Sequence, residues 1–216
     1  MLATSVTRRQ EIARVAERYG VHVLDDDCYR LMRTSHIGPS YRLLLPELGW
    51  YVTSPSKSIT ASLRIGFAVA PSGWGGALMR TAAFGSFGIS RLVTDVYVHL
   101  MGQPGLDAVV DQVKARIRQD VRAAVNALGR YQMNWSEDVP FFWLDLPQGW
   151  RAGEFCQAAE TAGVLVKSAE DFSLRDSSAV HSVRVAVHGF VPHGRFLEAM
   201  SVLRDLLYNP PERTSV

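Results

Sequence analysis

The sequence has little cysteine and no long apolar run, and both shortages narrow the class of protein. Its two cysteines, Cys28 and Cys156, lie far apart and fit no metal-binding or redox spacing, which favours a reducing compartment. The N-terminus lacks the apolar segment of a secretion signal, and no run approaches the length of a membrane span. We therefore expect a cytoplasmic protein with no membrane partner.

The sequence also lacks a large excess of charge of either sign. The 216 residues carry a formal net charge of +2, with 20% charged and 47% hydrophobic residues, the composition of an ordinary globular protein. No cluster of Lys and Arg indicates binding to nucleic acid. The six histidines show no ligand spacing, so we expect no metal site.

Two glycine-rich stretches resemble catalytic motifs without completing them. Gly73 and Gly75 follow an expected strand, but the third glycine position of the dinucleotide fingerprint falls on Leu78. The run Gly85-Ser86-Phe87-Gly88 lacks the spacing of a nucleophile elbow. A surface loop is the better interpretation of the first stretch.

Hydrophobic periodicity predicts an α/β chain. A first helix begins with a capping box of Thr7 and Gln10 and ends at Gly20. A long helix spans residues 106–128, and residues 30–49 show little regular structure. The other expected helices are 89–101, 154–162 and 195–208, and the other expected strands are 21–24, 51–53, 64–70, 141–144, 164–167 and 183–187.

The stretch from residue 50 to 71 predicts an anion site. Its two strands read as buried, and the loop between them is too short for a helical crossover, so neighbouring strands must run antiparallel. Lys57 and Arg64 then emerge at one end of the sheet. Hydroxyl side chains lie beside them, among them Ser54 and Ser56. Two cations with several hydroxyls suit something anionic.

Two further features are charged residues that lie at the end of an apolar strand or within one. Asp25, Asp26 and Asp27 follow an expected strand, where open α/β sheets bind ligands, although a solvated acidic turn is an alternative interpretation. Arg184 lies within an apolar strand, on the opposite face from its two valine neighbours, and needs a partner. A structural ion pair is the simplest such partner.

Taken together, these residues resemble a known family. Asp26-x-x-Tyr29 after a strand, then Ser54-x-Ser56-Lys57, then Arg64, resembles the fold type I, class I/II pyridoxal-phosphate-dependent aminotransferases. Within that family the chain looks closest to the aminotransferase-like domain of MocR-type regulators. The resemblance covers essentially the whole chain. It implies an α/β fold of the aspartate aminotransferase-like type, with a homodimeric assembly.

The resemblance also implies a role for each residue. Lys57 would form a Schiff base with pyridoxal 5'-phosphate and later act as general base and acid. Arg64, Ser54 and Ser56 would hold the phosphate. Asp26 would pair with the pyridine nitrogen, and Tyr29 with the phenolic oxygen. Arg184 would bind the α-carboxylate of an amino acid or 2-oxo acid.

The same resemblance implies a division of the chain and a gap in it. Residues 1–104 would be part of the cofactor-binding large domain, 105–130 a linking helix and 131–216 a small α+β domain. The family's Asn-Pro-x-Gly turn, phosphate loop and stacking aromatic would precede residue 1. We therefore expect the isolated chain to bind the cofactor weakly and to turn over negligibly. The alternatives are the effector-sensing half of a GntR/MocR-type regulator and a non-catalytic truncated homologue.

Overall fold

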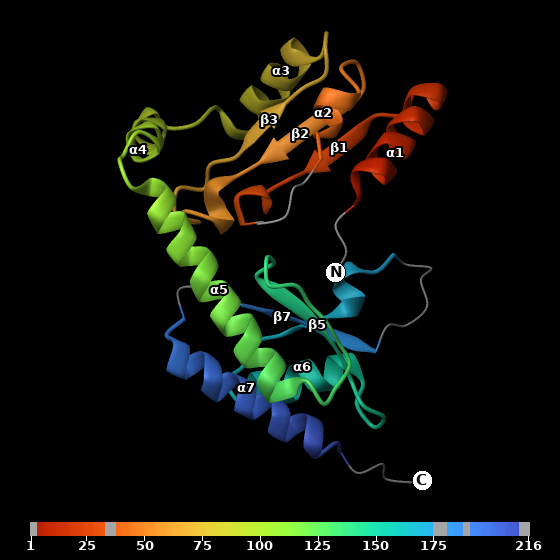
Figure 1. Ribbon diagram of the computed structural model, residues 1–216, viewed down its shortest axis with the longest axis vertical. Helices are drawn as coiled ribbons and strands as arrows, with labels where there is room; N and C mark the ends of the chain where they lie inside the picture. The colour runs from red at the N-terminus through yellow and green to blue at the C-terminus, as the bar shows by residue number, and fades with distance from the viewer. Residues whose placement is uncertain (1–3, 33–37, 175–180, 188–190, 212–216) are drawn as a thin grey trace. The chain divides into compact units, whose positions relative to one another are not determined.

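The chain divides into two compact units. The computed structural model describes residues 4–32, 38–174, 181–187 and 191–211 (Figure 1). The first unit is Leu2–Val113 and the second is Lys114–Val216. Their boundary falls inside α5 (Leu106–Leu128), whose bounds match the predicted long helix. The finer division at residues 104 and 131 stays a prediction.

The first unit is built on a three-stranded sheet of order β1-β2-β3. Strand β1 runs parallel to β2, and β2 runs antiparallel to β3, as the short connecting loop predicts. The elements in chain order are α1 (Val6–Tyr19), β1 (Val23–Asp26), η1 (Arg30–Met32), α2 (Tyr41–Leu44), β2 (Gly49–Thr53), η2 (Pro55–Lys57), β3 (Phe67–Val69), α3 (Gly75–Ser86) and α4 (Arg91–Met101).

Helices α1 and α2 form the core of this unit with the sheet. Ala13, Ala16, Tyr41 and Leu45 make a buried cluster, and Val23 of β1 packs against it. Helix α1 ends at Gly20, whose φ of 63° lies in the left-handed region that glycine adopts without strain.

Three local predictions for this unit are wrong. The N-cap of α1 is Ser5, whose hydroxyl accepts a hydrogen bond from Arg8 N at 3.2 Å, so the predicted Thr7 capping box lies inside the helix. Strand β1 begins two residues later than predicted, because Val21 N donates to Ala16 O in the helix cap. Residues 30–49 include the short helices η1 and α2, while residues 33–37 lie outside the described part.

The prediction of two buried strands is also wrong for β3. All three residues of β3 are exposed, and β2 is mostly half-buried. Strand β3 lies at an edge of the sheet and has one neighbour. Helices α3 and α4 bury none of their own residues, so apolar sequence here is not matched by a covering layer within the described part of the unit.

The second unit is an antiparallel sheet of order β4-β5-β7-β6. Apolar residues from α5, β5, β7, α6 and α7 form its core, including Leu128, Phe142, Phe155, Val183 and Leu203, all completely buried. Its remaining elements are β4 (Met133–Asn134), β5 (Phe141–Asp145), α6 (Ala152–Thr161), β6 (Lys167–Ser168), η3 (Ala169–Phe172), β7 (Ser182–Ala186) and α7 (His193–Tyr208).

The predicted strand at 164–167 is largely wrong. Val164 N donates to Ala159 O at 2.8 Å and Gly163 N donates to Glu160 O at 2.9 Å, so these amides close the end of α6. Only Lys167 and Ser168 remain to form a ladder with β7. The two-residue strand β4 was not predicted, because it is too short to show a period.

In the part of the chain that the structure describes, no helix combines the length and the apolar character that crossing a membrane requires.

Candidate functional site

The carboxyl ends of the parallel strands β1 and β2 bring the predicted site residues of the first unit to one edge. Asp26 lies opposite Val52 in the ladder. Beyond the ladder, Asp27 N donates to Val52 O at 2.9 Å and Thr53 Oγ1 donates to Asp27 O at 3.3 Å. These bonds hold the turn after β1 beside the loop that begins at Ser54. The predicted grouping of acidic and basic residues therefore follows from the parallel pairing.

The three consecutive aspartates do different things because side chains alternate across a strand. Asp25 is buried and bonds to Arg9 at 2.9 Å, and Asp27 is buried and bonds to Arg30 at 2.9 Å. Asp26 is exposed. The alternative of a solvated acidic turn is wrong for Asp25 and Asp27. Asp26 alone of the three presents its carboxylate at the surface.

Cys28 shows that Asp26 and Lys57 share one neighbourhood. Burial, a hydrogen bond to Asp26 and the charge of that carboxylate together raise the pKa of the Cys28 thiol to about 11. The charge of Lys57 opposes this shift and lowers the thiol pKa. The backbone N–H of Cys28 also donates to Asp26 Oδ1 at 3.4 Å. A carboxylate and an amine therefore lie within electrostatic reach of one thiol.

The loop after β2 presents Lys57 at the end of a short helical turn. Ser54 caps η2, accepting a hydrogen bond on its Oγ from Ser56 N at 3.4 Å, and Pro55 fixes the first turn. Lys57 is exposed, while Ser54 and Ser56 are half-buried. The next residue, Ser58, is 1% exposed, and its Oγ has no hydrogen-bond partner among the described residues.

Arg64 lies in the same β2–β3 connection, because Thr53 and Phe67 are paired in the ladder. It is exposed and adopts a φ of 51°, which is rare for a residue with a side chain. Such backbone strain is concentrated at functional sites. Tyr29 is half-buried in the turn after β1, and its carbonyl accepts a bond from Met32 N. Of the six predicted residues of the first unit, Asp26 thus ends β1 and the other five lie in the two segments that follow β1 and β2.

Arg184, in the second unit, is held by aromatic rings. Its guanidinium carbon lies 4.0 Å from the centre of the Phe141 ring and 5.2 Å from that of Phe172. Residues 175–180, which include Asp176, lie outside the described part of the chain, so the alternative of a structural ion pair for Arg184 stays a prediction. Stacking on ring faces leaves the in-plane N–H groups of a guanidinium available for a planar anion.

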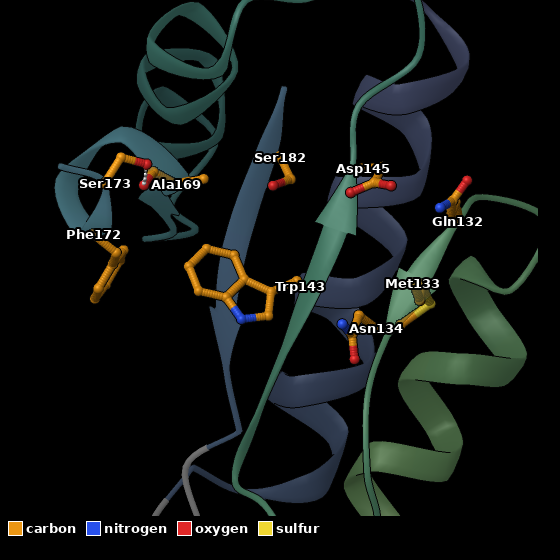
Figure 2. A pocket seen from close by; sticks show the side chains of 9 residues that line it. All are labelled: Gln132, Met133, Asn134, Trp143, Asp145, Ala169, Phe172, Ser173 and Ser182. Carbon is orange, nitrogen blue, oxygen red and sulfur yellow. Dashed lines mark hydrogen bonds between the residues drawn. The ribbon is translucent and has the colours of Figure 1, made fainter. Parts of the chain in front are cut away.

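A cavity of about 400 Å³ lies on the face of the second unit's sheet that carries Trp143 (Figure 2). Trp143, which lies opposite Arg184 in the ladder, meets Phe172 edge-on at 5.4 Å. The lining residues are Gln132, Met133, Asn134, Trp143, Asp145, Ala169, Phe172, Ser173 and Ser182. Ser168 caps η3 by accepting a bond from Glu170 N at 3.2 Å.

Sequence reasoning gave no role to three residues around the first unit's edge, namely Arg9, Ser58 and Cys28, and it did not predict that Asp25 is buried against Arg9. Alternation along residues 25–27 was a usable signal, because it predicts that the outer two aspartates share a face. The contact between Arg9 and Asp25 had no local signal, since 16 positions separate the two residues.

Comparisons with known proteins agree with this architecture. No family profile matches the chain. The chain is 22% identical over 203 residues to an uncharacterized HTH-type transcriptional regulator, YdeF, of Bacillus subtilis, covering 94% of this chain and 44% of that protein. The chain therefore spans less than half the length of that curated relative.

Solved structures of aminotransferases match most of the chain. The α-aminoadipate aminotransferase LysN of Thermus thermophilus, complexed with N-(5'-phosphopyridoxyl)-L-leucine, matches with a TM-score of 0.79 and 20% identity over 95% of this chain and 55% of its own. The kynurenine aminotransferase of Pyrococcus horikoshii matches with a TM-score of 0.80 and 20% identity, over 94% of this chain and 51% of its own. An aspartate aminotransferase of Rhodobacter sphaeroides matches with a TM-score of 0.80 and 21% identity, over 96% of this chain and 54% of its own.

These matches define the class of fold. The chain has the α/β fold of the pyridoxal-phosphate-dependent aminotransferases, over about half the length of those enzymes. More particularly, it is similar both to these enzymes and to a transcription regulator, of which it covers 44% of the length.

Proposed function

We propose that this chain is the lysine-bearing part of a pyridoxal-phosphate-dependent, aminotransferase-like protein that transfers an amino group between an amino acid and a 2-oxo acid. The observation that carries the proposal is the edge where Asp26 and Lys57 both act on the Cys28 thiol, with Arg64 on the same loop. A cytoplasmic homodimer belongs to the same proposal. The expected weak binding and negligible turnover of the isolated chain belong to it as well.

The residues at this edge fit the cofactor. Pyridoxal phosphate supplies an aldehyde that condenses with amines and a protonated ring that withdraws electrons. Lys57 is exposed and offers an amine, and Arg64 offers a guanidinium suited to a phosphate. Asp26 is the one aspartate of its run that is free of a buried ion pair, as a partner for a ring N–H requires. The hydroxyl of Ser58, next to Lys57, has no hydrogen-bond partner among the described residues and leaves a donor for a ligand.

Each residue then has a chemical task. Lys57 binds the cofactor and moves a proton at the substrate Cα. Arg64 holds the phosphate with the hydroxyls of Ser54 and Ser56, and Asp26 holds a proton on the pyridine nitrogen. Tyr29 donates to the phenolic oxygen.

Arg184 binds the substrate carboxylate in this proposal. Its aromatic stack supports that role, because Phe141 and Phe172 orient the guanidinium without neutralising it.

A second candidate function is effector sensing within a transcription regulator. The similarity to an HTH-type regulator favours it. In that case the same residues bind pyridoxal phosphate and an amino compound without turnover.

One assay separates the two candidates. The chain is loaded with pyridoxal phosphate and mixed with an amino-acid donor, and the released 2-oxo acid is measured. Release of up to one equivalent of 2-oxo acid per chain that disappears in Lys57→Ala supports the enzyme, because a single amino transfer to the bound cofactor is compatible with the negligible turnover expected of the isolated chain. Cofactor binding that responds to the amino acid without release supports sensing. Absence of any cofactor binding by the wild-type chain contradicts both candidates.

A further inference from the structure

The buried ion pair between Arg9 and Asp25 lies directly behind Asp26. Arg9 Nη1 donates to Asp25 Oδ2 at 2.9 Å, and the pair's side chains are 9% and 8% exposed. Asp25 Oδ2 also accepts from Tyr41 N at 3.1 Å, and Arg9 Nη1 reaches Pro39 O at 3.4 Å. The guanidinium lies 5.0 Å from the centre of the Tyr41 ring. Helix α1, strand β1 and the start of α2 therefore converge on one carboxylate.

This convergence matters because β1 lies at an edge of the sheet that the described residues form. It is hydrogen-bonded to β2 on one side, and Asp26 is its last residue. The end of an edge strand frays unless other contacts hold it. Asp25 and Asp26 are consecutive, so whatever fixes the Asp25 side chain on one face also fixes the direction of Asp26 on the other.

An ion pair is not the expected way to stabilise such a site. Replacing a buried pair by apolar residues of similar volume is often neutral or stabilising, while the pair supplies directional contacts that apolar side chains lack. Here Arg9 Nε is itself buried without a hydrogen-bond partner among the described residues, an additional cost. Direction is therefore the property that the pair contributes.

We propose that Arg9 and Asp25 are positioning residues for Asp26, holding the end of β1 so that the Asp26 carboxylate projects from the sheet edge at a fixed place. The significance of this for cofactor binding rests on the proposed function. The positioning itself is a property of the chain without cofactor.

Cys28 reports on Asp26 without any cofactor. Its thiol is hydrogen-bonded to Asp26, and that bond contributes to the raised thiol pKa of about 11. If the Asp26 carboxylate is displaced, the thiol pKa falls, a larger fraction of Cys28 is thiolate at a given pH, and alkylation becomes faster. Peptide-resolved mass spectrometry follows the iodoacetamide rate at Cys28, with Cys156 in the second unit as the internal standard.

The test compares two paired replacements at the same strand end. Arg9→Met with Asp25→Leu removes the clamp with no change of net charge. Asp27→Asn with Arg30→Gln removes the neighbouring pair, which joins residues three positions apart and does not reach α1. Asp26→Asn removes the carboxylate altogether and gives the largest expected increase in the Cys28 alkylation rate.

We expect the Cys28 rate at pH 8 to rise about tenfold, toward the Asp26→Asn value, in the first pair and to stay within about twofold of wild type in the second. Arg9→Lys keeps the charge but loses the contact of two guanidinium nitrogens with Asp25, so we expect a smaller rise in the Cys28 rate. This variant replaces the first double variant in the test if the latter does not fold.

The affinity for pyridoxal phosphate provides a second readout. It falls about tenfold in Arg9→Met with Asp25→Leu, in parallel with the Cys28 rate. A changed Cys28 rate with no cofactor binding even by wild type overturns the proposed function and leaves the positioning role supported. A folded clamp variant whose Cys28 rate and cofactor affinity both equal those of wild type overturns the positioning role.

Discussion

Asp120 of α5 offers a strong test of how buried charge is organised in the second unit. Its side chain is completely buried, and it accepts hydrogen bonds from His193 Nδ1 at 2.6 Å and Arg116 Nε at 2.9 Å. Arg116 also donates to Val191 O at 2.8 Å, so the cluster fixes the start of α7 on α5. The two partners remain 32% and 30% exposed. Water can therefore solvate the partners without Asp120, whereas Asp120 cannot be solvated without its partners.

This asymmetry gives an ordering of stabilities. Arg116→Met with His193→Leu leaves a buried carboxylate uncompensated, which costs about 3–5 kcal/mol. Asp120→Leu removes the buried charge itself and costs about 1–2 kcal/mol, mainly in lost charge-assisted hydrogen bonds. Urea unfolding followed by circular dichroism measures the difference as a shift in midpoint of about 1 M between the two variants.

A matched surface pair provides the control. Arg122 and Glu137 lie 2.8 Å apart and exposed, so removing both should leave the urea midpoint unchanged. If Asp120→Leu proves as destabilising as the loss of both partners, then desolvation does not govern this cluster and the reasoning is refuted.

Two further changes test the first unit's packing and the second unit's anion site. Gly49→Ala would place a Cβ against the carbonyl oxygen of Tyr41, and we expect a loss of about 1–3 kcal/mol in urea unfolding, whereas Gly66→Ala meets nothing closer than an ordinary contact at 3.6 Å and should be nearly neutral. Equal stability of the two variants would contradict this packing. Arg184→Lys keeps the charge but loses the planar fork between Phe141 and Phe172, so the affinity for a 2-oxo acid, followed by NMR at the Trp143 indole, should fall about tenfold. An unchanged affinity would argue against carboxylate binding at this arginine.

The sequence predicts elements best where periodicity is long. The apolar stripe of α5 repeats over 23 residues, and both ends of that helix were correctly predicted. Short elements escape, because two residues in β4 or four in α2 show no period. Cap positions are uncertain for a related reason. Ser5 and Thr7 are both good N-caps, and the choice between them depends on where the chain turns before the helix.

Burial and side-chain partners were harder to predict than elements. The apolar run in β3 indicated burial, yet burial depends on what covers a strand, and nothing in the run itself specifies that. Asp25 and Asp27 have the same local sequence context as Asp26, but their partners, Arg9 and Arg30, come from α1 and the following turn. The stacking of Arg184 on aromatic rings had no signal in the sequence, because Phe141 and Phe172 lie far from it along the chain. The proximity of Lys57 and Arg64 was predictable because a short loop fixes the direction of its two strands, whereas the place of Asp26 depends on the parallel pairing of β1 with β2.

The central claim is that Lys57 carries the cofactor. The chain has three lysines, Lys57, Lys114 and Lys167, and the latter two lie in α5 and β6 of the second unit. Incubation with pyridoxal phosphate, reduction with borohydride and peptide mapping identify which lysine gains the phosphopyridoxyl mass. The account predicts that the peptide containing Lys57 carries the label, that Lys57→Ala abolishes it, and that Lys114→Ala and Lys167→Ala do not. Labelling that is spread evenly over the three lysines, or that survives Lys57→Ala, would contradict it.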